Sequence, residues 1–150
     1  HQFAQFSVQE LLHDLAEYYQ PLAKAQQCRL VLALSTGIEL FGDRALVFQA
    51  MANLIENALK YAAGQGRIGL GIQLYRGWLS LCVKDAGPGI SPALYGAATE
   101  RFERLGQQDA QKGYGLGLSL VKAIAELHGG KIAFASAQPG LIVYLCLNRN

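Results

Sequence analysis

Charged residues are scarce in this chain, which has 13 Lys and Arg, 11 Asp and Glu, and a net charge of +2 over 150 residues. So small an excess of positive charge argues against a nucleic-acid footprint or a polybasic membrane surface. Long apolar runs are absent too, since none approaches the ~20 residues that span a bilayer. Residues 1–8 lack both the charged start and the apolar centre of a signal peptide. We therefore expect no nucleic-acid partner and no direct membrane contact in this segment.

Cysteine is also sparse. The three cysteines, Cys28, Cys82 and Cys146, lie far apart and form no C-x-x-C pair. This spacing predicts neither a disulfide framework nor a zinc site. Because Cys82 and Cys146 lie in apolar runs, we expect buried thiols of a reducing compartment, which favours the cytoplasm.

Histidine is equally rare, and none of the three histidines has a catalytic setting. His1 is terminal, and His13 falls on the expected surface of a helix. His128 ends a helix before two glycines, where a donor or cation stabilises the last carbonyl groups, so a structural role is favoured. The sequence contains no Ser-His-Asp or Cys-His signature.

What the sequence does contain is enough apolar material for one folded domain. Hydrophobic residues make up 51% of the chain, which argues against disorder and allows a real core. We expect a single domain over residues 1–150, in which residues 1–6 are the remnant of a linker. The chain begins without Met, and we expect it to be a piece of a longer protein.

Three segments have helical periodicity. The first starts at a capping box, Ser7-Val8-Gln9-Glu10, and runs to about residue 27, although Pro21 interrupts it. The second has Asp43 as N-cap and ends near residues 63–64, and the third covers residues 116–128. The expected apolar stripes are Leu11, Leu12, Leu15, Tyr18, Tyr19 and Leu22, and then Val47, Met51, Leu54, Ile55 and Ala58.

The other regular segments have the pattern of strands joined by turns. They are residues 29–35 and 38–41, residues 67–75 and 78–84, and residues 131–136 and 141–147. Residues 91–112 have no clean periodicity, and irregular segments of that length are usually functional, often a lid. We predict an α+β fold, a two-layer sandwich in which three helices cover one face of a mixed, mostly antiparallel sheet of about five strands.

The second helix carries a polar stripe. At ~100° per residue, Asn57 lies about 40° from Asn53, Lys60 about 20° the other way and Glu56 about 60° away. Carboxamide oxygens suit Mg²⁺, which usually shares its ligands with substrate phosphates, and an ammonium group suits the phosphates themselves. A solvated helix face is the ordinary interpretation of such a stripe.

Two glycine-rich segments follow. In Asp85-Ala86-Gly87-Pro88-Gly89-Ile90 the glycines allow a ligand to approach, and the carboxylate could accept a hydrogen bond from an exocyclic amine; a plain turn is the alternative. Residues 112–118, K-G-Y-G-L-G-L, open a helix whose free amides attract phosphate. Their glycine spacing fits neither a Rossmann fingerprint nor a Walker A loop.

Taken together and in this order, these segments resemble the catalytic and ATP-binding domain of bacterial sensor histidine kinases, in the superfamily of gyrase, heat-shock chaperone and mismatch-repair ATPases. Residues 53–61 look like its N box and residues 85–90 like its first glycine box. Residues 101–104 resemble its F box and residues 113–118 its second glycine box. Each box is weak alone, but four in register are highly specific.

The resemblance implies a role for each matching residue. Asn57 would ligate Mg²⁺ and, with Lys60, carry the catalysis, while Asn53 and Lys60 would approach the phosphates. Tyr61 would pack near the adenine and Asp85 would bind its amino group. Further ATP-binding positions would be Gly87, Gly89 and Ile90 around the base, Phe102 in the lid, and Gly113, Gly115, Leu116, Gly117 and Leu118 around the phosphates.

One position discriminates within the superfamily. Its hydrolysing members carry a Glu four residues before the metal-binding Asn, whereas this chain has Asn53 there. Without that base the γ-phosphoryl group would go to a histidine imidazole. The family's histidine box is absent, so the acceptor would lie upstream in the parent protein. Thr99, Ala86 and Leu141 depart from the usual pattern of the lid, the first glycine box and the last strand.

The resemblance also implies partners and alternatives. The partners would be the protein's own upstream dimerisation and phosphoacceptor domain and the receiver domain of a response regulator, with ATP and Mg²⁺ as cofactors. The segment would be a cytoplasmic domain of a protein anchored in the bacterial inner membrane. The alternatives are a degenerate nucleotide-binding or docking module without transfer, and an anti-sigma type serine kinase.

Overall fold

The computed structural model describes residues 2–33, 37–61, 66–86, 114–137 and 139–149, and the statements below concern these residues. The elements in order are β1 (Ala4–Ser7), α1 (Val8–Ala25), β2 (Cys28–Leu32), β3 (Glu39–Gly42), α2 (Arg44–Tyr61), β4 (Gly66–Tyr75), β5 (Trp78–Lys84), α4 (Tyr114–Leu127), β6 (Lys131–Ser136) and β7 (Leu141–Asn148).

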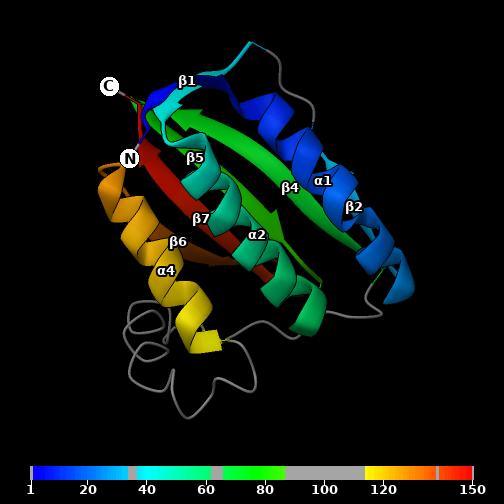
Figure 1. Ribbon diagram of the computed structural model, residues 1–150. Helices are drawn as coiled ribbons and strands as arrows, with labels where there is room; N and C mark the ends of the chain where they lie inside the picture. Colours follow the sequence, from blue (N-terminus) through cyan, green and yellow to red (C-terminus); the bar gives the residue numbers. More distant parts are fainter. Residues whose placement is uncertain (1, 34–36, 62–65, 87–113, 138, 150) are drawn as a thin grey trace.

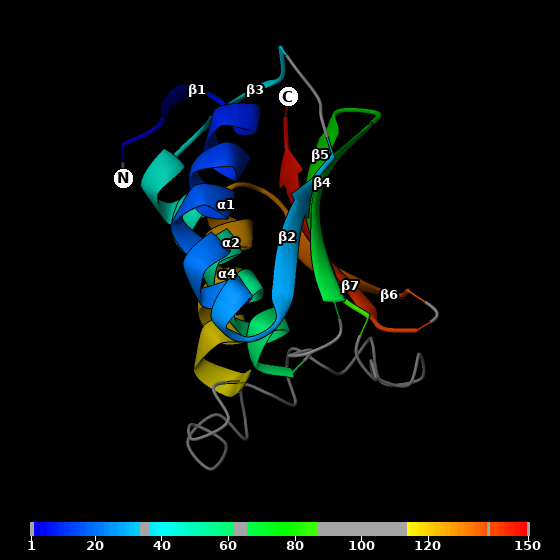
Figure 2. The ribbon, with the colours of Figure 1, turned by 90° about the vertical axis from the view of Figure 1, so that its right-hand side faces the viewer.

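The main sheet has five strands in the order β2-β4-β5-β7-β6, and a separate two-stranded sheet pairs β1 with β3. Only β2 and β4 are parallel in the main sheet; its other neighbours are antiparallel. The three helices form one layer against a single face of this sheet (Figures 1 and 2). The predicted α+β two-layer sandwich is confirmed.

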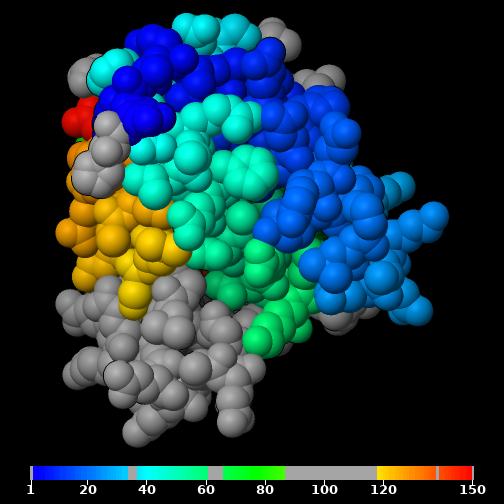
Figure 3. Space-filling view, in the orientation of Figure 1, coloured from blue at the N-terminus to red at the C-terminus, as the bar shows by residue number. Residues whose placement is uncertain are grey.

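The core lies between the two layers, because side chains alternate along each strand and every second one faces the helices. The buried strand residues include Leu30, Ile68, Leu70, Leu79, Leu81, Val83, Leu145 and Leu147. On α2 the predicted apolar stripe is confirmed, since Val47, Met51, Leu54, Ile55 and Ala58 are all buried. Figure 3 shows the outer surface of the helix layer, with α2 lying between α1 and α4.

The stripe predicted for the first helix is wrong at two positions: Tyr18 is 70% exposed and Leu22 43% exposed. The buried side of α1 is centred near Tyr19, and at ~100° per residue Tyr18 points well away from it. The predicted start of α1 is confirmed, because the Ser7 hydroxyl accepts a hydrogen bond from the Glu10 amide at 3.2 Å. The helix continues through Pro21 and ends at Ala25.

Other differences concern the strands and the last helix. Strand β1 overlaps the residues expected to be linker, and it pairs antiparallel with β3 from Ala4 opposite Gly42 to Ser7 opposite Glu39. Helix α4 begins at Tyr114, two residues earlier than predicted. The turn at Arg76 and Gly77 is confirmed, with φ of 45° and 83°, as a two-residue hairpin with positive φ requires.

The prediction of buried thiols at Cys82 and Cys146 is wrong, because both are only partly buried. Both lie on the sheet face that points away from the helices, opposite Tyr144 and Ser80 respectively. The apolar runs around them belong to strands of which only one side is packed against the helix layer. Burial raises the pKa of the Cys82 thiol.

His128 joins three segments at one end of the helix layer. Its Nε2 accepts a hydrogen bond from the Asp43 amide at 3.0 Å, and its Nδ1 donates to the Ile124 carbonyl at 2.8 Å. The Phe3 ring stacks on the imidazole with a centroid separation of 4.9 Å. The predicted structural role at a helix end is confirmed and extended, because the ring also holds the start of α2.

Asp43 is the predicted N-cap of α2, and its Oδ1 accepts a hydrogen bond from the Leu46 amide at 3.2 Å. Its other oxygen accepts from the Gln2 amide at 3.1 Å. The bond from Gln2, followed by that from Leu46, lowers the pKa of the Asp43 carboxyl. The cap therefore connects the first residues of the chain to the helix that carries the polar stripe.

We expect His128→Leu to destabilise the fold by about 2–3 kcal/mol, because it removes two hydrogen bonds and leaves the buried Asp43 amide without an acceptor. His128→Gln keeps an acceptor near the position of Nε2 and should restore part of the loss. Urea unfolding measures both variants. Equal destabilisation by Leu and Gln would show that the bond to Asp43 contributes little.

Candidate functional site

The polar stripe of α2 faces away from the core, as its spacing predicts. Asn53 and Asn57 are partly buried, whereas Glu56 and Lys60 are exposed. These four side chains line a pocket of about 400 Å³, together with Leu59, Leu22 of α1, and Gln26, the C-cap residue of α1. The pocket exists because the end of α1 runs beside the second half of α2.

Gln26 is a pocket residue that the sequence analysis missed. Its Oε1 is buried and accepts no hydrogen bond from the residues that the structure describes. A buried oxygen of this kind normally has a partner. The carboxamides of Asn53 and Asn57 give the pocket neutral oxygens beside the Lys60 ammonium, a donor set that fits a hydrated Mg²⁺ ion and phosphates.

A hydrogen bond across the helix pair fixes one wall of this pocket. The Tyr19 hydroxyl of α1 donates to Oε2 of Glu56 on α2. Burial, and then this carboxylate, raise the pKa of Tyr19 far above its ordinary value. The phenol is neutral at physiological pH, and its hydrogen bond keeps Glu56 turned toward α1.

Asp85 follows the last residue of β5 and is anchored from the neighbouring strand β7. Its amide donates to the Leu141 carbonyl at 3.0 Å, and its Oδ1 accepts from the Leu141 amide at 3.3 Å. Gly140 lies against the same backbone: a Cβ added there would sit 2.0 Å from the Asp85 carbonyl oxygen. The carboxylate is thus positioned by residues more than fifty positions later in the sequence.

Helix α4 supplies the third part of the site. It begins at Tyr114, so Gly115, Leu116 and Gly117 lie in its first turn. An amide group in a first turn has no partner inside the helix and can bind a phosphate oxygen. Leu118 is 3% exposed, so its side chain belongs to the core and only its backbone can face a ligand.

These three parts lie at the same end of the molecule. In Figures 1 and 2 the end of α2, the end of β5 and the start of α4 all point to the lower end. The predicted residues Gly87, Gly89, Ile90, Phe102 and Gly113, together with the side chain of Tyr61, lie outside what the structure describes. Their predicted roles remain predictions.

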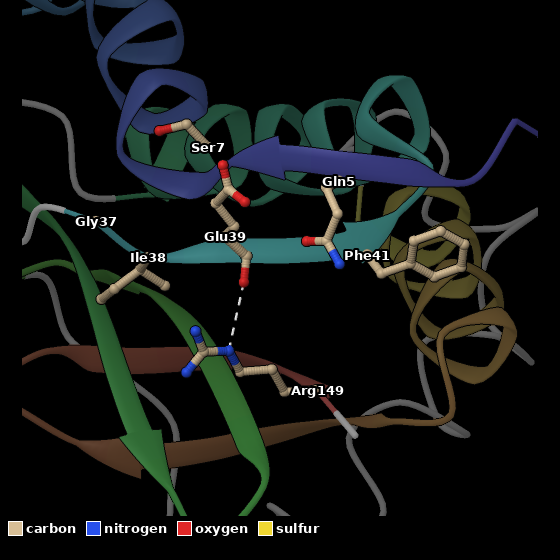
Figure 4. A pocket seen from close by; sticks show the side chains of 7 residues that line it. All are labelled: Gln5, Ser7, Gly37, Ile38, Glu39, Phe41 and Arg149. Carbon is tan, nitrogen blue, oxygen red and sulfur yellow. Dashed lines mark hydrogen bonds between the residues drawn. The ribbon is translucent and has the colours of Figure 1, made fainter.

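A second pocket, of about 400 Å³, contains none of the predicted residues. It lies beside β1 and β3, where the Arg149 side chain donates from Nε to the Glu39 carbonyl at 3.3 Å (Figure 4). The other side chains that line it are Gln5, Ser7, Ile38 and Phe41. This pocket is where the end of the chain meets the small sheet.

Two further findings limit the chemistry of the described part of the chain. It holds no group of three or more His, Cys, Asp or Glu side chains arranged to bind a metal ion. A metal at the α2 stripe would therefore have fewer than three such side chains among the described residues and would depend largely on carboxamides, water and the ligand. Nor does any helix in the described ranges have the length and apolar character that crossing a membrane requires.

Comparison with known proteins points to one family. A family model described as histidine kinase-, DNA gyrase B-, and HSP90-like ATPase matches residues 42–149. The chain is 39% identical over 105 residues to the signal transduction histidine-protein kinase/phosphatase MprB of Mycobacterium ulcerans, covering 69% of this chain and 20% of that protein. It is 32% identical over 130 residues to the heme sensor protein HssS of Staphylococcus aureus, covering 87% of this chain and 28% of that protein.

The fold comparison covers more of the chain. The catalytic domain of the histidine kinase ThkA matches with a TM-score of 0.86 at 22% identity, covering 99% of this chain and 97% of that chain. The two curated relatives are much longer, and this chain spans less than a third of either. The match therefore concerns the ATP-binding part of such proteins.

Proposed function

Because the chain belongs to the family of histidine kinase-, DNA gyrase B- and HSP90-like ATPases, we propose that it binds Mg²⁺-ATP and donates the γ-phosphoryl group to a histidine on a separate phosphoacceptor domain. The observation that carries the proposal is the meeting of three features at one end of the fold. They are the Asn53–Asn57–Lys60 face of α2, the anchored carboxylate of Asp85 and the first turn of α4.

The roles follow from the chemistry of each group. Asp85 accepts a hydrogen bond from the adenine amino group, while its contacts to Leu141 keep it in place. Lys60 and the first-turn amides of α4 neutralise and orient the phosphates. Asn57 would offer an oxygen to Mg²⁺, and the bound ion would supply positive charge against the negative charge of the phosphates during transfer. Asn53 lies beside it and contacts the phosphates.

Transfer rather than hydrolysis follows from position 53. A carboxylate there could take a proton from water, but a carboxamide cannot serve as a base. A neutral imidazole needs no such help, because its nitrogen already carries a lone pair. That nitrogen bonds to the γ-phosphorus while the bond to the β,γ-bridging oxygen breaks and ADP leaves, and the proton on the second ring nitrogen is released to water.

The proposed partners lie outside the described residues. They are the protein's own upstream dimerisation and phosphoacceptor domain and the receiver domain of a response regulator. We place this domain in the cytoplasm and the parent protein in the bacterial inner membrane. The chain spans less than a third of the length of the curated relatives, which is compatible with such additional domains.

The test is direct. Calorimetry with Mg²⁺-ADP should detect binding to the purified chain, and incubation with Mg²⁺-ATP and an added phosphoacceptor domain should give an acid-labile phosphohistidine. An acid-stable product would indicate a serine kinase, and nucleotide binding without transfer to several cognate acceptors would indicate a binding module. No calorimetric signal at millimolar nucleotide would contradict the proposal.

We expect Asp85→Asn to weaken ADP binding roughly tenfold or more, because a carboxamide replaces a charged acceptor of the adenine amino group. The same variant keeps a side-chain oxygen for the Leu141 amide, so its unfolding free energy should change little. Inorganic triphosphate, which lacks the base, is the matched control ligand and should bind both proteins equally. Unchanged ADP affinity would remove Asp85 from the adenine site.

A further inference from the structure

The sheet face opposite the helices is uncovered by the described elements. Figure 2 shows the sheet edge-on, with α1, α2 and α4 on one side and no described helix or strand packed on the other. We call this surface the open face. Its residues alternate with the buried ones and come from all five strands of the main sheet.

All the charged side chains on the described part of the open face are positive. That part carries the exposed side chains of Arg29, Arg67, Lys84 and Lys131 and contains no Asp or Glu. None of these four cations forms an ion pair with a described residue; the ion pair found among the described residues joins Arg44 and Asp14, on the helix side. The described acidic residues are Glu10, Asp14, Glu17, Glu39, Asp43, Glu56, Asp85 and Glu126, none of which belongs to the open face.

The strand register places the four cations along a diagonal. Arg29 on β2 pairs with Arg67 on β4. Lys84 on β5 pairs with Gly69, which lies two residues along β4 from Arg67. Lys131 on β6 is level with Ser80 on β5, which lies four residues along that strand from Lys84. With strands ~4.8 Å apart and ~3.4 Å per residue, the diagonal is roughly 25–30 Å long. That is the length of about 18 residues of α-helix.

Small side chains form a floor on one side of this diagonal. They are Gly69, Gly71, Ser80, Cys82 and Cys146, on β4, β5 and β7, and the longer side chains of Gln73 and Tyr144 lie at their edges. Two aromatic residues lie next to the floor, on the side away from the cations: Tyr75, which is 67% exposed, and Trp78, which is 39% exposed. The floor thus lies between a row of cations and an aromatic pair, and its short side chains leave room for a helix to pack on the sheet.

From this arrangement we propose that the open face docks an amphipathic helix of a partner protein that carries a row of Asp or Glu along one edge. The acidic row would lie on Arg67, Lys84 and Lys131, and the apolar side would rest on the small-residue floor against Trp78. Charge complementarity selects an acidic partner over a second copy of this chain, whose open face is positive. The inference is independent of the nucleotide site, which lies on the helix side of the sheet.

The experiment uses a built-in reporter, because Trp78 is the single tryptophan of the chain. An 18-residue helical peptide of Ala and Leu with Glu along one edge is titrated against the whole chain while Trp78 emission is followed. A peptide with Gln at the Glu positions is the control. We expect the Glu peptide to shift the emission with an affinity that falls as salt rises, and the Gln peptide to bind roughly tenfold more weakly or not at all.

Three variants test the placement. The pair Lys84→Glu and Lys131→Glu should weaken Glu-peptide binding by roughly tenfold or more, whereas Lys24→Glu on α1 should change it less than about twofold. Gly69→Val should also block binding, because the valine side chain would occupy the space in which the peptide helix would lie. Its Cβ meets only the Lys84 Cβ, at 3.9 Å, so folding should tolerate it. Thermal unfolding and Mg²⁺-ADP binding confirm that each variant is folded.

Several results would overturn the inference. Equal binding of the Glu and Gln peptides would show that the row of cations does not contribute to binding. Binding of the Glu peptide to Gly69→Val with unchanged affinity would show that the peptide does not lie on the floor. An absent Trp78 response at millimolar peptide would exclude the site altogether. A stronger response to phosphatidylglycerol vesicles or to an oligonucleotide than to the Glu peptide would replace the protein partner by a membrane or a nucleic acid.

Discussion

Alanine at position 140 is expected to destabilise the fold by about 2–6 kcal/mol, from the combined costs of backbone strain and overpacking. Gly140 has φ of +105°, where a side chain is strained. The added Cβ would also lie 2.0 Å from the Asp85 carbonyl oxygen and 2.9 Å from the Ala86 Cα. These neighbours are backbone atoms, so the clash is relieved only by separating the end of β5 from the start of β7.

That separation should also affect the nucleotide. The Asp85 carboxylate is held by the Leu141 amide, and both move when position 140 is displaced. We therefore expect Gly140→Ala to weaken ADP binding at temperatures where the variant is still folded, with no loss of inorganic triphosphate binding. Urea unfolding and calorimetry provide the two measurements.

Gly66→Ala is the matched control for backbone strain. Gly66 has φ of +95°, but an added Cβ there meets no atom within 4 Å. Gly66→Ala should therefore lower the free energy of unfolding only by the strain of a left-handed backbone conformation, about 1–2 kcal/mol. If Gly66→Ala and Gly140→Ala lower the free energy of unfolding equally, the contact with Asp85 does not have the role we assign to it. Normal ADP binding by Gly140→Ala would lead to the same conclusion.

Local patterns predicted much of this fold. The helical period placed Val47, Met51, Leu54, Ile55 and Ala58 in the core and Asn53, Asn57 and Lys60 on the opposite side. Turn chemistry located the Arg76–Gly77 hairpin, and capping rules located Ser7 and Asp43. These features depend on residues within one or two turns of each other.

The features that local patterns missed depend on distant residues. Strand β1 has no recognisable pattern alone and exists because β3 lies beside it. Cys82 and Cys146 look like core residues, but the uncovered side of a sheet cannot be recognised until the helices are placed. Gln26 faces the pocket only because α1 ends beside α2. His128 bonds to Asp43 across 85 positions, and Asp85 to Leu141 across 56.

Asn57→Ala should abolish the effect of Mg²⁺ on nucleotide affinity while leaving the fold intact. Asn57 lies on the outer side of α2, and alanine is a better helix former, so stability should hold or rise slightly. Loss of the only protein oxygen that we assign to the metal should lower Mg²⁺-ADP affinity by roughly 10- to 100-fold. Binding of ADP in the presence of a chelator should not change.

The comparison that isolates the metal is the ratio of ADP affinities with and without Mg²⁺, measured by calorimetry. For Asn57→Ala this ratio should approach one, whereas Gln49→Ala, an exposed change on the same helix, should keep the wild-type ratio. Asn57→Asp retains an oxygen ligand but adds a negative charge near the phosphates. It should therefore keep the dependence on Mg²⁺ and bind metal-free ADP less tightly than the wild type. If Asn57→Ala kept the wild-type ratio, the metal would be held by phosphates and water alone, and Asn57 would be a phosphate contact like Asn53.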